Sequence, residues 1–451
     1  MAKTKKKKEI SLEEKLEQAL VPIDEQPYEV PENWCWVKLS AISEVVTGST
    51  PSKNKPEYYG NDFPFFKPAD LDAGRNTIVA SEYLSDAGKS VSRVIPAEST
   101  AVCCIGSIGK SGYLEVDGST NQQINSVISK VNPLYLYYFI NTDTFINELW
   151  EKSSATTISI VNKSKMESNR IPVAPLEEQK RIVEQIEELF AKLDEAKGKI
   201  EDTLDNFKIR KLSVLHKAFS GQLTKKWRNG NLNIEYKREK LQNLTSIIGD
   251  GLHGTPCYDE KGEYYFVNGN NFDGKTIKIK ADTKTVNEEE FEKYKKNLSD
   301  KSTVFVSING TLGKTAFYNN EPIILGKSAC YLNVLPELNK YYLRYYFETE
   351  EFMQYANEKA TGSTIKNLGL KAMRELQINL PPIDEQEKIV HFLDEILYKE
   401  ELAKERAEKV LEQIDLIKKS ILAKAFRGEL GTNNPDEESA VELLKSILST
   451  E

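Results

Sequence analysis

The sequence predicts an α+β protein with two globules of mixed helix and strand. Two long antiparallel helices join the globules and form a coiled coil, as a pseudo-two-fold internal repeat. Three observations indicate this fold. A long segment that begins at Pro175 recurs without a gap at Pro382, 207 residues later. Apolar residues in both copies step by three and four. Each copy follows a segment of short β-like runs that are broken by Gly, Ser, Asn and Pro.

The two repeated segments each predict a helix of about 44 residues, roughly 65 Å long. Pro175 and Pro382, each followed by acidic residues, suit helix N-termini, where the backbone dipole favours negative charge. Gly221 and Gly428 suit the C-terminal caps. The shared apolar phase predicts a helix–helix seam formed by Ile182, Ile186, Leu189, Leu193, Ala196, Ile200, Phe207 and Val214 in the first copy and by Ile389, Leu393, Ile396, Ala403, Ala407, Val410, Ile414, Ile417 and Ile421 in the second.

The repeat divides the chain into six segments. They are an N-terminal arm (1–33), a first globule (34–173), a central helix region (174–224), a second globule (225–380), a C-terminal helix region (381–431) and a C-terminal tail (432–451). Runs such as TAVCCIG, SGYLEV, STVFVSI, KTAFYN and ACYLNVL predict strands inside the globules. The globules are less alike than the helices, as expected if each globule recognises something different.

Composition excludes several classes of protein. No stretch reaches the roughly 18 apolar residues that a membrane span needs. Five scattered cysteines without a C-x-x-C pair, and only three histidines, argue against a zinc site. The odd number of thiols, and a basic start without the apolar core of a secretory signal, indicate a cytoplasmic protein. That basic start is expected to be a solvated tail, with a weak nucleic-acid contact as the alternative.

The net charge of −8 argues weakly against a protein that coats DNA. It does not exclude DNA binding, because local basic surface matters more than the total charge.

Two segments partly match the sequence pattern of the phosphate-binding loop of nucleotide hydrolases. CCIGSIGKSG at 103–112 and SINGTLGKTA at 307–316 both end in Gly-Lys-Ser/Thr, but Cys104 and Ile308 stand where the loop needs its first glycine. We interpret both as hairpin turns that need positive φ, with Lys110 and Lys314 near a phosphate backbone. Because deaminase, zinc-protease, hydrolase and methyltransferase motifs are absent as well, we predict no catalytic residue, no metal and no cofactor.

Polar loops recur in both globules and are rich in Ser, Thr, Asn, Gln, Lys and Gly. Such side chains bind phosphates and base edges, although the same residue types also form ordinary turns. The candidate DNA-binding residues of the first globule are Thr47, Ser49, Thr50, Lys53, Lys55, Ser107, Lys110, Ser111, Asn121, Gln122, Gln123, Thr156, Thr157, Ser159 and Lys163. Those of the second are His253, Thr255, Asn268, Asn270, Asn271, Asn309, Thr311, Lys314, Ser363, Thr364, Lys366 and Asn367.

The layout resembles the specificity (S) subunit of type I restriction–modification systems. The matching features are APLEEQKRIV and PPIDEQEKIV at the helix starts, AFSGQL and AFRGEL at their ends, and VPENWCWVKL at 30–39. The two globules resemble the variable regions of this family only in their general composition. No preference for particular bases can therefore be transferred to this chain.

The resemblance implies two target recognition domains that each read one half of a split, asymmetric site in double-stranded DNA. It also implies helices that set the gap between the halves and dock two methyltransferase (M) subunits, with endonuclease/translocase (R) subunits joining the complex. The S subunit itself would catalyse nothing. The alternative is a scaffold or adaptor whose coiled coil binds only protein, and salt-dependent DNA binding would separate the two.

Overall fold

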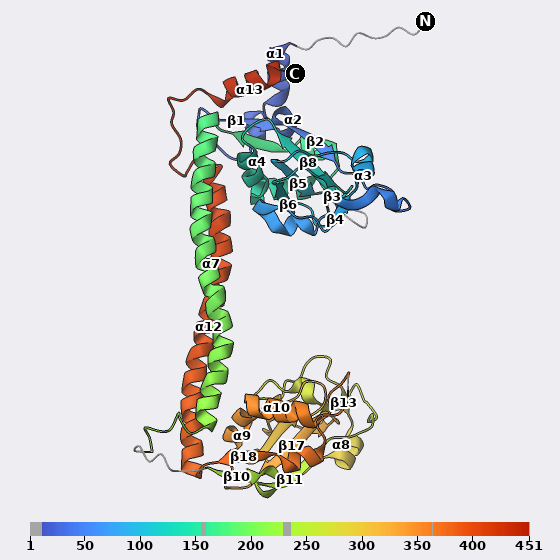
Figure 1. The fold of residues 1–451 in the computed structure, drawn as a ribbon, viewed down its shortest axis with the longest axis vertical. Helices are drawn as coiled ribbons and strands as arrows, with labels where there is room; N and C mark the ends of the chain where they lie inside the picture. The colour runs from blue at the N-terminus through green and yellow to red at the C-terminus, as the bar shows by residue number, and fades with distance from the viewer. Residues whose placement is uncertain (1–10, 155–158, 229–235, 363, 451) are drawn as a thin grey trace. The chain divides into compact units, whose positions relative to one another are not determined.

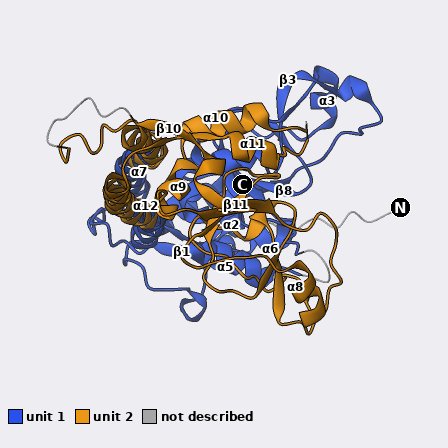
Figure 2. Ribbon diagram, turned by 90° about the horizontal axis from the view of Figure 1, so that it is seen from below, with its two compact units in different colours: residues 1–199, 410–451 blue, residues 200–409 orange. Residues whose placement is uncertain are grey.

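The computed structural model describes residues 11–154, 159–228, 236–362 and 364–450. The chain forms two compact units, residues 1–199 with 410–451 and residues 200–409 (Figure 2). The division cuts both long helices. Each unit therefore contains one globule, the start of one long helix and the end of the other. The lysine run of the N-terminus lies outside the described residues.

The first unit is built on an antiparallel four-stranded sheet in the order β2-β8-β5-β6 (Figure 1). A three-stranded sheet, β4-β3-β7, and the pair β1-β9 complete its strands. The strands are β1 (Cys35–Lys38), β2 (Ser43–Thr47), β3 (Tyr59–Phe66), β4 (Glu82–Leu84), β5 (Ser99–Cys103), β6 (Ser111–Leu114), β7 (Ser119–Thr120), β8 (Ile124–Ser129) and β9 (Arg170–Val173). The short helices are α1 (Leu12–Ala19), α2 (Leu39–Ile42), α3 (Asp86–Val91), α4 (Pro133–Ile140), α5 (Asp143–Lys152), α6 (Lys163–Glu167) and α13 (Ala440–Ser449).

The second unit repeats this topology. Its four-stranded sheet has the order β11-β17-β14-β15, its three-stranded sheet the order β13-β12-β16, and β10 pairs with β18. The strands are β10 (Lys237–Lys240), β11 (Thr245–Asp250), β12 (Tyr264–Val267), β13 (Thr285–Val286), β14 (Thr303–Ser307), β15 (Thr315–Phe317), β16 (Ile323–Leu325), β17 (Ala329–Val334) and β18 (Gln377–Leu380). The short helices are α8 (Glu288–Tyr294), α9 (Lys340–Tyr346), α10 (Glu350–Lys359) and α11 (Leu370–Glu375). The five β-like runs named above correspond to β5, β6, β14, β15 and β17, so those strand predictions are confirmed.

The two long helices are α7 (Leu176–Phe219, 44 residues) and α12 (Ile383–Ala425, 43 residues). Gly221 and Gly428 follow them with φ of +75° and +74°, as the predicted caps require. Within the first unit the start of α7 meets the end of α12, where Lys418 pairs with Asp194 at 2.5 Å. Within the second unit the end of α7 meets the start of α12, where Arg210 pairs with Glu400 at 3.3 Å. The helices are therefore antiparallel in both units.

The predicted seam is only partly buried. Ile182 and Ile186 are fully buried in the first unit, and Ile389 and Leu393 in the second, because the globules cover the first turns of each helix. The prediction is wrong for Ala196, Ala403, Val410 and Ile417, which are exposed, the last two at 40% and 46%. A single neighbouring helix covers only a narrow stripe of a long helix, so residues beside that stripe stay exposed.

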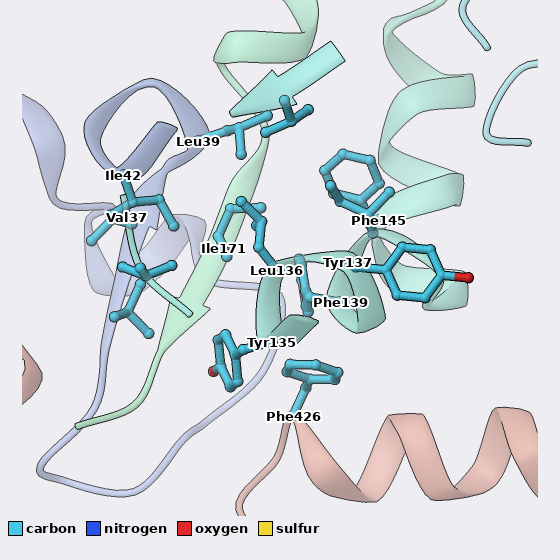
Figure 3. Packing of buried hydrophobic residues seen from close by; sticks show 14 of the residues in the cluster. Val37, Leu39, Ile42, Tyr135, Leu136, Tyr137, Phe139, Phe145, Ile171 and Phe426 are labelled. Atoms are coloured by element: carbon cyan, nitrogen blue, oxygen red, sulfur yellow. The ribbon is translucent and has the colours of Figure 1, made fainter. Parts of the chain in front are cut away.

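An aromatic cluster joins the end of each long helix to a globule. In the first unit Phe426, just after α12, packs edge-on against Tyr135 and Phe139 of α4, with ring centroids 5.0 and 5.1 Å apart (Figure 3). In the second unit Phe219 packs against Tyr342 and Tyr346 of α9, at 4.8 and 5.5 Å. The phenylalanines of AFRGEL and AFSGQL are thus core residues of the globules.

The Glu-Gln pair that opens each long helix is buried, which the sequence analysis did not predict. Glu178 accepts a 2.8 Å hydrogen bond from the Trp34 indole and another from Asn433, which follows α12. Glu385 accepts from the Thr224 hydroxyl at 2.6 Å, in the segment that follows α7. Each glutamate therefore binds the chain that leaves the other helix, in addition to its favourable position at a helix N-terminus.

Helices also occur in the described parts of the N-terminal and C-terminal segments. Helix α13 lies within the segment expected as a tail, and its Ala440 and Leu444 are buried. It packs against α1, where the Lys15 ammonium donates to the Leu448 carbonyl at 3.0 Å. Among the described helices none is both long and apolar enough to span a membrane.

Candidate nucleic-acid interface

Three loops gather at one end of each four-stranded sheet. In the first unit they follow β2, precede β8 and follow β5; because these strands are antiparallel neighbours, the three loops meet at the same end. In the second unit the loops after β11, before β17 and after β14 meet in the same way. Most of the candidate residues lie in these loops or in the segments that pair with them.

The doubled Gly-x-x-Gly-Lys segment forms a hairpin turn in both units, as predicted. It joins β5 to β6 and β14 to β15, which pair antiparallel. Gly106 and Gly109 have φ of +80° and +87°, and Gly310 and Gly313 have +75° and +81°. Glycine is the residue that adopts this conformation without steric cost. Burial raises the pKa of the neighbouring Cys104 thiol to about 12, so the thiol stays protonated at neutral pH.

The two lysines after these turns differ. The Lys110 ammonium lies 2.7 Å from the Asp72 carboxylate. Lys314 is exposed, and its ammonium has no ion-pair partner among the described residues. The chemistry of a phosphate contact is therefore available at Lys314, whereas Lys110 would have to leave Asp72 or share its charge.

In the first unit the loops after β2 and before β8 are bonded to each other. The Thr50 hydroxyl donates to the Gln122 amide oxygen, and the Thr47 hydroxyl donates to Asn125 at 2.7 Å. The Ser49 backbone N–H donates to the Thr120 carbonyl at 2.9 Å. Gly48 permits this approach, because an added Cβ would lie 2.1 Å from the Asn121 carbonyl oxygen. The result is a hydrogen-bonded pair of polar loops, formed by residues 47–50 and 121–123, which we name the polar loop pair.

The loop after β5 contacts the segment before α6. The Gly106 N–H donates to the Ser159 carbonyl at 3.3 Å, and Ser107 beside it is exposed. Thr156 and Thr157 lie outside the described residues, as does Ser363 in the second globule.

In the second unit the equivalent loops enclose an open hollow of about 650 Å³. Six candidate residues line it: His253, Thr255, Asn268, Asn270, Asn309 and Asn367. The Asn309 and Asn367 side chains are hydrogen-bonded to each other at 3.5 Å, and His253 is 2.7 Å from the Asp250 carboxylate. The structure thus brings together residues that span more than a hundred positions of the sequence.

The hollow also has a lining that sequence reasoning missed. Phe266 and Ile365 supply apolar surface, and Lys327 and Ser328 supply a cation and a hydroxyl from the turn before β17. A Gly-Lys-Ser run at 326–328 was the available signal, but it lacks the first glycine of the doubled segment, because Ile323 stands at that position. We name this set, together with the six candidates, the second-globule hollow.

Other candidate residues lie apart from these clusters or have inward-facing side chains. Ser111 is buried and donates to Asn141 at 2.9 Å; Asn271 is buried and donates to the Lys278 carbonyl at 2.9 Å. Asn121 is buried and bonds Gln123 at 3.1 Å. The remaining candidates are exposed, with local partners where the structure gives one: Lys53, Lys55 beside Tyr58, Lys163 beside Glu167, Thr311, Thr364 and Lys366 beside Asn357.

The sequence of the chain matches the model of a known protein family. Residues 31–206 and 235–413 match the family described as "Type I restriction modification DNA specificity domain". The chain belongs to this family. It carries two DNA specificity domains, which correspond to the duplicated topology described above.

Curated relatives and solved structures agree with this assignment. The chain is 24% identical to the StySPI specificity subunit of Salmonella potsdam and to the EcoKI specificity subunit of Escherichia coli K12, over 93% of this chain and 95% of each relative. A chain in a structure of a type I R-M system has a TM-score of 0.70 at 19% identity, with 90% of this chain and 100% of that one covered. The HsdS subunit of Thermoanaerobacter tengcongensis has a TM-score of 0.58 at 20% sequence identity, again with 90% of this chain and 100% of that one covered. These structures support the fold of the specificity family.

Proposed function

We propose that this chain is the non-catalytic, DNA-reading subunit of a type I restriction–modification complex, and that each globule reads one half of a bipartite site. The domain boundaries would be 34–173 and 225–380, with 174–224 and 381–431 as the helical spacer regions. The observation that carries the proposal is the clustering of polar loops at equivalent ends of the two sheets. The second-globule hollow is its clearest example.

The hollow has the chemistry for base-edge recognition. Amide side chains such as Asn270 present a donor and an acceptor together, which can pair with adenine. Lys327 supplies a charge for phosphate, and Phe266 an apolar surface for a thymine methyl group or a base. The polar loop pair of the first unit has hydroxyls and amides in another arrangement, so the two halves of the site should differ in sequence.

The long helices would set the distance between the half-sites and dock the M subunits, which R subunits then join. Exposed apolar side chains on both helices support a protein-binding surface. Ile209 is 67% exposed and Leu416 is 65% exposed, and the two positions are equivalent in the repeat. Large exposed apolar residues at matching sites suit two copies of one partner.

The test uses the full chain assembled with its methyltransferase subunits. Sequencing of methylated bases in the host should give a bipartite site. Asn270→Ala should then lower the affinity for that site, or its discrimination against one substituted base pair, by about tenfold, because a bidentate amide contact contributes roughly 1–3 kcal/mol. Asn319→Ala, at an exposed turn of the same globule, is the matched control.

Binding that does not depend on salt or sequence in the wild-type complex would favour the adaptor alternative instead. An Asn270→Ala complex that binds and discriminates like the wild type would remove this residue from the interface without affecting the family assignment.

A further inference from the structure

Each globule is attached to the start of a long helix by a buried glutamine. The Gln179 side chain accepts from the Asn132 N–H at 3.0 Å and donates to the Ala174 carbonyl at 2.8 Å. The Gln386 side chain accepts from the Asn339 N–H at 2.8 Å and donates to the Pro381 carbonyl at 2.9 Å. Both glutamines are fully buried, and both bind the N-cap residue of the helix α4 or α9.

A second contact lies farther along the same two helices. The Tyr138 hydroxyl of α4 donates to the Glu187 carboxylate of α7 at 3.1 Å. The Tyr345 hydroxyl of α9 donates to the Asp394 carboxylate of α12 at 2.5 Å. Burial and then the neighbouring carboxylate raise the pKa of both tyrosines above the usual range, so each hydroxyl keeps its proton and remains a donor.

These pairs occupy equivalent positions in the repeat, although the globules that present them differ in most loops. The carboxylate follows the glutamine by eight residues in both helices, which corresponds to about 12 Å along the axis. The apolar core around Ile182 and Ile186, or around Ile389 and Leu393, also joins each globule to its long helix, but apolar contacts are not directional. Two hydrogen bonds about 12 Å apart are directional, and they orient α4 or α9, and therefore the globule, relative to the long helix.

Resting on the proposed function, we infer that Gln179 with Tyr138–Glu187, and Gln386 with Tyr345–Asp394, are positioning residues that restrict the complex to one spacer length. A spacer one base pair too long displaces a half-site by about 3.4 Å and rotates it about the DNA axis. A globule oriented by both hydrogen bonds cannot follow that movement without breaking one of them. When the tyrosine contact is removed, the globule can tilt on its apolar contacts toward the displaced half-site.

Hydrogen bonds with a charged partner are suited to this role. They are directional, and they are about twice as strong as bonds between neutral groups. Asp394 is exposed and Glu187 is half-buried, so their loss leaves no cavity in either core. The positions can therefore be altered without removing a core side chain.

The experiment measures binding of the assembled complex to duplexes with the native spacer and with one base pair more or fewer. The quantity of interest is the ratio of the dissociation constants for altered and native spacers. We expect Tyr138→Phe with Tyr345→Phe, and separately Asp394→Ala, to lower this ratio by about tenfold, the effect of one charge-assisted hydrogen bond. Preferences within each half-site should stay the same.

Two controls separate positioning from general damage. Asp394→Asn keeps an acceptor oxygen for Tyr345 and should retain most of the spacer preference. Glu395→Ala removes the neighbouring carboxylate, which pairs with Lys399 inside α12, and should change nothing.

Wild-type binding without preference for a bipartite site would refute the proposed function itself. A clear wild-type spacer preference that the Tyr and Asp394→Ala variants retain would refute only the positioning role. Failure of the near-isosteric Tyr→Phe variants to assemble would also refute it, because the contacts would then act in assembly rather than in orientation.

Discussion

The two globules share a framework and differ at the surface that we assign to DNA. Their four-stranded sheets have the same strand order, their hairpin turns have the same positive-φ glycines, and their α4 and α9 helices bind the long helices through equivalent residues. The loops at the end of each sheet differ. One unit has a hydrogen-bonded polar loop pair, and the other a hollow lined in part by asparagines. The framework is thus independent of the side chains that we propose to read DNA.

The most severe test of this comparison exchanges a whole globule. Replacement of residues 34–173 by the corresponding region of another specificity subunit should change one half of the methylated site completely and leave the other half unchanged. The physical reason is that the attachment side chains on α7, such as Gln179, lie outside the exchanged segment. Methylated-base sequencing gives the result directly, and simultaneous change of both half-sites would contradict the independence of the globules.

A smaller effect is expected when a charge is placed in the predicted seam. The loss of stability should be large at a buried seam position and small at an exposed one. Leu393→Asp places a carboxylate in the core of the second unit and should destabilise it by about 4 kcal/mol, because a buried charge without a partner is costly. Ile417→Asp, at a position that is 46% exposed, should change stability by no more than about 0.5 kcal/mol. Denaturant unfolding of both variants measures the difference. Equal losses would mean that Ile417 is covered in solution.

The smallest expected effect compares the two hairpin lysines. Lys314→Ala should weaken DNA binding by a few-fold for all sequences and reduce the slope of log affinity against log salt by about 0.9, the value for one phosphate contact. Lys110→Ala should have less effect, because Asp72 already neutralises that ammonium. Salt titrations of the two variants provide the measurement, and a larger slope change for Lys110→Ala would reverse the assignment.

Sequence reasoning predicted the parts of the fold that local patterns encode. The long helices, their glycine caps, five strands and the hairpin turns follow from periodicity and from glycine placement. It overestimated how many seam residues are buried. Periodicity indicates that a helix has an apolar face, but not whether a neighbouring element covers that face, and Val410 is exposed for this reason. It missed the burial of Glu178, since acidic residues after a proline already suit a helix N-terminus. The lining of the hollow was predicted only in part. Its asparagines were identified because they lie in polar loops. Phe266 and Lys327 were missed, because tertiary contacts bring them to the hollow and no local sequence pattern indicates such contacts.

The division of the chain into units has a consequence for its synthesis on the ribosome. Residues 200–409 form a contiguous unit, so the second unit can complete its core as soon as that segment has emerged. The first unit waits for residues 410–451, because Phe426 fills its aromatic cluster and α13 covers its first helix. The globule that is made first is therefore the last to become native. Premature termination between residues 409 and 426 would release a chain whose N-terminal globule lacks Phe426 and exposes an unfilled core, a natural substrate for chaperones and proteases.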